Sequence, residues 1–193
     1  MNPVVVCIPT TPERRDILAR CVQSIHVCAG YPCIIMTHEN EYEGFVVAIH
    51  RILDRLRDEA LVWVIGDDIV MHEPDTMKRM VEEYEKAYPD RDGVVNPNDG
   101  IQCGALITAP LTTAKIMREG TCTRFFHSYA DNLFTDKMKR LGKYTYLPDI
   151  KITHLHHCNG LAKKDRTYNV AADHLYQDYK TYQELSATLY NHD

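Results

Sequence analysis

Apolar residues in the first half of the chain form short, continuous runs that alternate with stretches of helical spacing. Val4–Ile8, Cys33–Met36 and Leu61–Ile65 are continuous apolar runs, as expected of strands that are buried on both faces. Between these runs, apolar positions recur every three or four residues at Ile17–Ile25 and at Phe45–Leu56, which predicts two helices. Alternation of this kind predicts right-handed crossovers and a parallel sheet.

The second half of the chain carries a weaker pattern, in which short apolar runs and helical periodicities are separated by turn residues. The expected helices are Pro74–Tyr88, Leu111–Glu119, Asp131–Leu141 and Val170–Leu189, and the expected strands are Gly93–Asn96, Gly104–Thr108, Tyr144–Leu147 and Ile150–Thr153. The pattern as a whole therefore predicts an α/β protein whose mostly parallel sheet is flanked by helices.

Composition narrows the class of molecule. The 193 residues are 45% hydrophobic and 25% charged, which is ordinary for one globular domain with its own core. No run of about 18 apolar residues is present, so no membrane span and no membrane partner are expected. The first residues lack a basic segment and do not resemble a signal peptide. Seven cysteines without CxxC spacing favour reduced thiols and a cytoplasmic location.

The charge of the chain argues against nonspecific binding to nucleic acid. A net charge of −5 gains little from release of counterions. Two local groups of basic residues in the C-terminal third are the exception: Lys137, Lys139, Arg140 and Lys143, then Lys163, Lys164 and Arg166. A solvated helix face and a charged loop explain these groups equally well.

Polar residues follow each of the three N-terminal apolar runs. In sheets of this kind, ligands bind beyond the carboxyl ends of the strands. Since the three strand ends share one edge, residues that are far apart in the sequence are expected to converge there. These residues are Thr10, Thr11, Arg14, His38, Glu39, Asp67 and Asp68.

Asp67 and Asp68 follow the most apolar run without a spacer. Two adjacent carboxylates are costly to hold together unless a cation neutralises them. Their oxygens suit Mg²⁺ or Mn²⁺, which commonly bridge protein carboxylates to substrate phosphates. The alternative interpretation is a solvated Gly-Asp-Asp turn. The position of the two aspartates at the end of an apolar strand favours the metal-binding interpretation.

His154, His156, His157 and Cys158 form the densest cluster of metal-binding residue types. In an extended segment, His154 and His156 would point to the same face, where they could share a metal or flank a phosphate. Zinc bound for structure or for hydrolysis is a competing hypothesis, although no second Cys/His pair stands at finger-like spacing. A hydrogen-bonding role is the alternative for each histidine.

Two residues are candidates for proton transfer. Asp131 opens a predicted helix, where its carboxylate can cap the helix, and it can also act as a general base. Both roles are compatible in one residue. His127, one helical turn earlier, is the weaker alternative for the base.

Phosphate binding is expected to depend on a metal rather than on a glycine-rich loop, with charged side chains as candidates for further contacts. Arg14, beside the strand edge, can pair with a phosphate, and Lys163, Lys164 and Tyr168 could close over a diphosphate as a loop. A plain charged loop is the alternative. Neither a dinucleotide-binding nor a Walker-type glycine motif occurs, and no nucleophile elbow is present.

These features together resemble the GT-A glycosyltransferases, in particular family 2-like members, over roughly residues 3–168. The opening strand with Pro9-Thr10-Thr11 and Arg14 resembles the family's nucleotide-binding start. Gly66-Asp67-Asp68 stands in place of the Asp-x-Asp metal motif, with Gly66 at its first acidic position, and Glu39 replaces a common aspartate. His154-Leu-His156, followed by Gly160, Lys163, Asp165 and Tyr168, is similar to the C-terminal end of small stand-alone phage glycosyltransferases.

The resemblance implies a single GT-A type (Rossmann-like) domain at residues 1–168, with residues 169–193 as a helical tail packed on it. It implies inverting transfer from a nucleotide-sugar, expected to be a UDP-sugar, to an acceptor hydroxyl. Asp131 would be the base, and Asp68, His154 and His156 would hold Mn²⁺ or Mg²⁺. The nucleotide would contact Pro9, Thr10, Thr11, Arg14, Glu39, Asp67, Lys163 and Tyr168.

Because some phage relatives modify hydroxymethylated DNA bases, such a base in modified DNA is a candidate acceptor, and the host cytoplasm a candidate location. Two alternatives stay open. A sugar-phosphate nucleotidyltransferase would need a glycine-rich basic loop after the first strand, which Thr10-Thr11-Pro12-Glu13 is not. A noncatalytic nucleotide-sugar-binding protein of the same fold would keep the binding residues without turnover.

Overall fold

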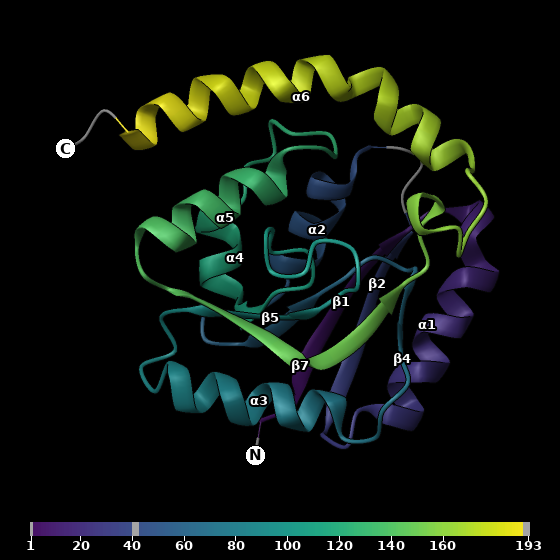
Figure 1. Ribbon diagram of the computed structural model, residues 1–193, viewed down its shortest axis with the longest axis vertical. Helices are drawn as coiled ribbons and strands as arrows, with labels where there is room; N and C mark the ends of the chain where they lie inside the picture. Colours follow the sequence, from purple (N-terminus) through teal and green to yellow (C-terminus); the bar gives the residue numbers. More distant parts are fainter. Residues whose placement is uncertain (1, 40–42, 191–193) are drawn as a thin grey trace.

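The computed structural model describes residues 2–39 and 43–190 and has an α/β architecture, with helices on both faces of one sheet (Figure 1). Its elements in chain order are β1 (Val4–Thr10), η1 (Pro12–Arg14), α1 (Arg15–Cys28), β2 (Cys33–Glu39), α2 (Phe45–Leu53), β3 (Leu61–Val64), β4 (Ile69–Met71), α3 (Thr76–Ala87), β5 (Val94–Asn98), β6 (Leu111–Thr113), α4 (Ala114–Gly120), α5 (Ala130–Arg140), β7 (Tyr144–His154), η2 (His157–Asn159) and α6 (Arg166–Tyr190).

The sheet has seven strands in the order β2-β1-β3-β6-β5-β7-β4. Strand β1 runs parallel to β2 and to β3, and β5 runs parallel to β7. The other three pairs, β3–β6, β5–β6 and β4–β7, are antiparallel. The α/β class is therefore confirmed, but the prediction of a mostly parallel sheet is wrong, because the sheet is mixed.

Two short strands account for the mixed sheet. Leu111–Thr113 was expected to begin a helix, but it forms β6, and the hydroxyl of Thr113 then caps α4 by accepting the Ile116 N–H at 3.4 Å. The other, β4, directly follows Asp68, and its pairing places Ile69 opposite His154. Three residues are too few to show a periodicity, so pattern reading misses both strands.

The strand expected at Gly104–Thr108 is a loop. Asn96 and Asp99, both buried, bind the polar groups that a strand would use. The Asn96 side-chain oxygen accepts the N–H groups of Thr108 and Ala109 at 3.1 and 2.8 Å. The Asp99 carboxylate accepts backbone N–H groups from the start of the loop and the Thr108 hydroxyl. Because these side chains satisfy the backbone, no ladder is needed.

The core lies on both faces of the central strands. All seven residues of β1 are buried, and alternate side chains point to opposite faces. Val4, Val6 and Ile8 pack with α1 and α3, whereas Val5 and Cys7 pack with α2, α4 and α5. Because both faces of β1 are buried, its sequence is a continuous apolar run rather than an alternating one.

The last helix, α6, packs along α5 and also covers the segment that precedes α5 (Figure 1). The expected boundary at residue 168 falls inside this helix. Asp178 of α6 is 1% exposed, and its carboxylate accepts the backbone N–H groups of Phe126, His127 and Ser128 at 2.8–2.9 Å. None of the helices in the described ranges is long and apolar enough to cross a membrane.

Replacing Asp178 by alanine is expected to lower the free energy of unfolding by about 2–3 kcal/mol, because three backbone N–H groups lose a buried, charged acceptor. Urea unfolding measures the loss. Asp173, exposed on the same helix, provides the matched control, since Asp173→Ala removes a carboxylate without orphaning these groups. Equal stability of the two variants would contradict the assignment.

Candidate functional site

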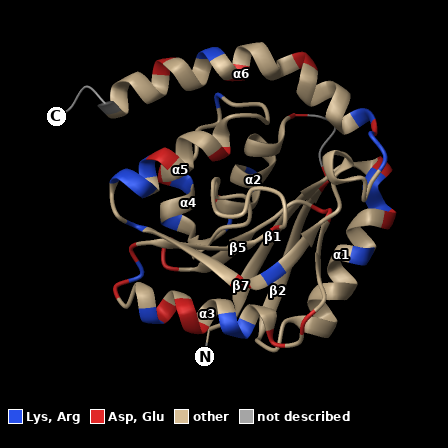
Figure 2. Cartoon of the chain, in the orientation of Figure 1, with Lys and Arg blue, Asp and Glu red and all other residues tan. Residues whose placement is uncertain are grey.

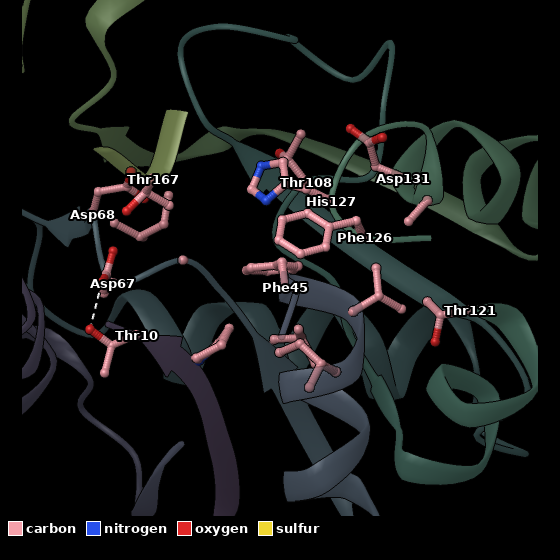
Figure 3. Close-up of a pocket in the computed structure, with 18 of the residues that line it drawn as sticks. Thr10, Phe45, Asp67, Asp68, Thr108, Thr121, Phe126, His127, Asp131 and Thr167 are labelled. Carbon is pink, nitrogen blue, oxygen red and sulfur yellow. Dashed lines mark hydrogen bonds between the residues drawn. The ribbon is translucent and has the colours of Figure 1, made fainter. Parts of the chain in front are cut away.

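A cavity of about 250 Å³ opens where β1 and β3 end, bounded by α2, α5 and the start of α6 (Figure 3). Small-molecule sites usually span roughly 300–1,000 Å³, so this cavity suits one compact group. It brings together most of the residues that the sequence pointed to. Its lining includes Pro9, Thr10, Thr11, Arg14, Asp67, Asp68, Asp131, His154, His156 and Tyr168.

Two of the expected binding residues lie outside the cavity lining. Glu39 ends β2 at the same sheet edge, but it is exposed and accepts a hydrogen bond from Arg15 Nε at 3.0 Å. Lys163 is exposed in the segment between η2 and α6. His38, also at this edge, lies 2.6 Å from Glu43. A role for Glu39 and Lys163 in holding a nucleotide stays a prediction.

Arg14 is the centre of a buried charge network. It is 6% exposed, and its Nε donates to both oxygens of Asp67 at 2.9 and 3.1 Å. Its terminal nitrogens donate to Asp68 at 2.8 Å and to Asp165 at 2.6 Å. Asp67 accepts a further hydrogen bond from Thr10 at 2.7 Å (Figure 3). Because the guanidinium faces three carboxylates, it fixes the aspartate pair in place.

Asp68 and His154 meet because β4 pairs with β7. Nε2 of His154 lies 3.3 Å from Oδ1 of Asp68, and the Leu155 N–H donates to the Asp68 carbonyl at 2.8 Å. Burial raises the pKa of Asp68, but His154 and Arg14 outweigh burial and hold this pKa below its usual range. Burial lowers the pKa of His154, and Asp68 overcomes burial and raises it. A positive charge opposite Asp68 is therefore favoured.

Tyr168 covers the same end of the cavity. Its hydroxyl lies 3.5 Å from Asp68 Oδ2, and its ring lies 5.8 Å from the Arg14 guanidinium carbon. Burial and the charge of Asp68 raise the pKa of Tyr168 to about 12, so the hydroxyl keeps its proton. The nearby Thr11 hydroxyl is buried and has no hydrogen-bond partner within the described ranges. A buried polar atom of this kind suits a bound ligand or water.

Aromatic rings stand in the middle of the cavity, with the aspartate pair on one side and Asp131 on the other (Figure 3). Phe45 meets His127 edge to face at 5.6 Å, and Phe126 stacks on His174 of α6 at 3.9 Å. Sequence reasoning missed this wall. Phe45 carries only the signal of a core residue, and the position of Phe126 depends on α6.

Asp131 lies in the first turn of α5, whose N-cap residue is Tyr129 rather than Asp131. Its carboxylate accepts the Asn132 N–H at 2.9 Å, and no salt bridge to it occurs within the described part of the chain. Burial raises the pKa of Asp131. Burial also lowers the pKa of His127, which favours the neutral imidazole.

Asp131→Asn is expected to raise stability at neutral pH. A carboxyl whose pKa is higher in the folded state favours its protonated form, so it costs stability above that pKa and costs none below the unfolded value of about 3.9. Urea unfolding at several pH values should show the gain shrinking as the pH falls. With exposed Asp149→Asn as the control, a loss of stability at neutral pH would contradict burial as the cause.

The basic residues do not gather around the cavity. Lys137 and Lys139 of α5 donate to the carbonyls of Glu119 and Ala105 at 2.6 and 2.8 Å. Figure 2 shows this group at one end of α5, apart from the basic residues that precede and begin α6. The two groups of basic residues in the sequence therefore form two separate patches.

The polar end of the cavity fits a divalent cation. Two ligands that lie about 2.1 Å from a metal, at right angles, are about 3.0 Å apart, close to the 3.3 Å between Asp68 Oδ1 and His154 Nε2. Arg14 occupies only the other oxygen of Asp68. A mixed oxygen and nitrogen pair suits Mn²⁺ better than Mg²⁺, which is usually held by oxygens.

Comparison of the chain with known protein families and with curated proteins finds no match. The cavity and the residues that line it are therefore the features from which a function can be inferred.

Proposed function

We propose that this chain is a metal-dependent glycosyltransferase that moves a sugar from a nucleotide-sugar to an acceptor hydroxyl with inversion. One observation carries the proposal: a single cavity places a carboxylate–imidazole pair at one end and the half-buried carboxylate of Asp131 across an aromatic wall. Transfer of this kind needs one group that holds charge next to the departing diphosphate and another that takes the proton from the acceptor.

Asp68 and His154 would hold the divalent cation. When bound, the cation supplies positive charge next to the diphosphate that departs. Arg14 keeps the Asp68 and Asp67 carboxylates oriented, because its hydrogen bonds to them leave little freedom of rotation. We assign Arg14 to positioning rather than to direct contact with phosphate.

The aromatic wall would orient the donor and exclude water. Phe45, Phe126 and His127 present ring faces and edges to the cavity, and the rest of its middle is apolar. Rings of this kind pack against a sugar or a nucleobase and lower the local dielectric, which strengthens the charge interactions at both ends. Water is kept from the anomeric carbon in the same way.

Asp131 would take the proton from the acceptor hydroxyl as that oxygen attacks. Its raised pKa increases its affinity for the proton. Attack from the side opposite the departing diphosphate gives inversion at the anomeric carbon. A UDP-sugar donor and a hydroxymethylated DNA base as acceptor are the specific substrates that we propose to test first.

A thermal-shift panel tests the proposal and identifies the donor. Because a ligand that binds only the folded state raises Tm, UDP-glucose, UDP-galactose, UDP-GlcNAc and GDP-mannose are compared with Mn²⁺ and with EDTA. One donor is expected to raise Tm with Mn²⁺ and not with EDTA. If no nucleotide-sugar shifts Tm in either condition, the glycosyltransferase proposal fails.

A further inference from the structure

A second group of metal-binding side chains lies beside the cavity, where β7 leads into η2. One ring nitrogen each from His156 and His157 and the Sγ of Cys158 lie within 4.8 Å of one another. Nε2 of His157 is 3.5 Å from Sγ of Cys158. Three consecutive residues converge because His156 is the extended N-cap residue and η2 then turns tightly.

We propose that His156, His157 and Cys158 form a zinc site that is separate from the position between Asp68 and His154. A tetrahedral zinc ion lies about 2.3 Å from sulfur and about 2.05 Å from nitrogen, so its sulfur and nitrogen ligands are about 3.6 Å apart. The 3.5 Å between Cys158 Sγ and His157 Nε2 matches this edge. A small rotation of His156 completes the three-ligand face.

A ring nitrogen of each of the two histidines is placed to bind a metal. Nδ1 of His156 accepts the Cys158 N–H at 3.2 Å, so its lone pair already points toward η2 and is free of a proton. A metal would take this lone pair in place of the amide proton. Nε2 of His157, the nitrogen that would hold the metal, faces Cys158 Sγ at 3.5 Å.

Tyr168 restrains both rings. Its ring lies 4.9 Å from that of His156 and 4.3 Å from that of His157, edge to face in both cases. Rings held in this way lose little freedom when a metal binds, which favours affinity. Cys158 is exposed, so a metal can enter from solvent, and three protein ligands leave a fourth position for water or a small ligand.

The two metal positions differ in chemistry. Asp68 offers oxygen and pairs with His154, whereas the η2 group offers sulfur and two imidazoles, which zinc prefers over manganese. His156 therefore belongs to the η2 group rather than to the Asp68 cation, contrary to the role that the family resemblance implied. The zinc site does not depend on the proposed transferase activity.

Cobalt(II) is the probe, because a thiolate ligand gives Co²⁺ a near-ultraviolet charge-transfer band. Metal-free protein titrated with Co²⁺ is expected to show this band, and added Zn²⁺ to remove it. Cys158→Ser should abolish the band and weaken zinc binding at least about tenfold. Cys103→Ser, which changes another exposed cysteine, should leave both unchanged.

His157→Ala should weaken zinc binding as Cys158→Ser does, whereas Asp68→Asn should keep the band. Absence of the band in the unchanged protein would overturn the proposal. Unaltered zinc affinity in Cys158→Ser would also overturn it. Loss of the band in Asp68→Asn would show that the thiolate site is not separate from Asp68 and would also overturn the proposal. Because no outcome involves a nucleotide, failure here is distinct from failure of the transferase proposal.

Discussion

Asp68→Asn is expected to abolish metal-dependent donor binding and to lower turnover by at least about 10³-fold, since a bound cation supplies several kcal/mol of charge stabilisation. The substitution keeps the shape of the side chain but removes the charge opposite His154. The fold should survive, because Arg14 keeps its hydrogen bonds to Asp67 and Asp165. Steady-state kinetics with a titration of Mn²⁺ measures both losses.

Asp90→Asn is the matched control for this variant. Asp90 is exposed beyond the end of α3 and does not line the cavity, so the same chemical change there should leave Mn²⁺ dependence intact. If Asp68→Asn bound the donor with unchanged Mn²⁺ dependence, the cation would lie elsewhere, and Asp68 would serve only the charge network of Arg14.

Asp131→Asn is expected to slow sugar transfer by about 10²–10⁴-fold while leaving donor affinity unchanged, because a general base acts only on the attacking hydroxyl. Asp131 lines the same cavity as Asp68 and His154, and its carboxylate accepts a hydrogen bond from the Asn132 N–H. Comparison of kcat with KM for the donor separates the two effects. The rate of the unchanged enzyme should fall as the pH drops through the raised pKa of Asp131.

His127 is the rival base, and the pair of variants distinguishes the two residues. It projects into the same cavity, and burial lowers its pKa, so it is neutral and able to accept a proton. His127→Gln should change donor affinity through the aromatic wall more than it changes kcat. A near-normal kcat in Asp131→Asn, together with a large loss in His127→Gln, would move the base to His127.

Parallel pairing explains what could be read from the sequence. Because β1 runs parallel to β2 and β3, the residues after β1 and β3 meet at one edge, as strand order alone predicts. Thr10, Arg14 and Asp67 form their hydrogen bonds there. A shared sheet edge does not determine where each side chain points, however. Glu39 lies at the same edge, but its carboxylate accepts a hydrogen bond from Arg15 instead.

The rest of the site depends on contacts that no local pattern encodes. His154 reaches Asp68 through the antiparallel register of β4, a strand of only three residues. The wall at Phe126 and His127 is held by Asp178, about fifty residues further along the chain. Within its helix, a buried aspartate looks like any other polar residue until its partners are known.

The most direct test of the account is a calorimetric titration of UDP into the unchanged protein, first with Mn²⁺ and then with EDTA. We expect binding that requires Mn²⁺ and weakens at least about a hundredfold in EDTA, because the diphosphate would be held through the cation. Equal affinity in both conditions would contradict a cation between Asp68 and His154. Absence of binding in both would contradict a nucleotide site in this cavity.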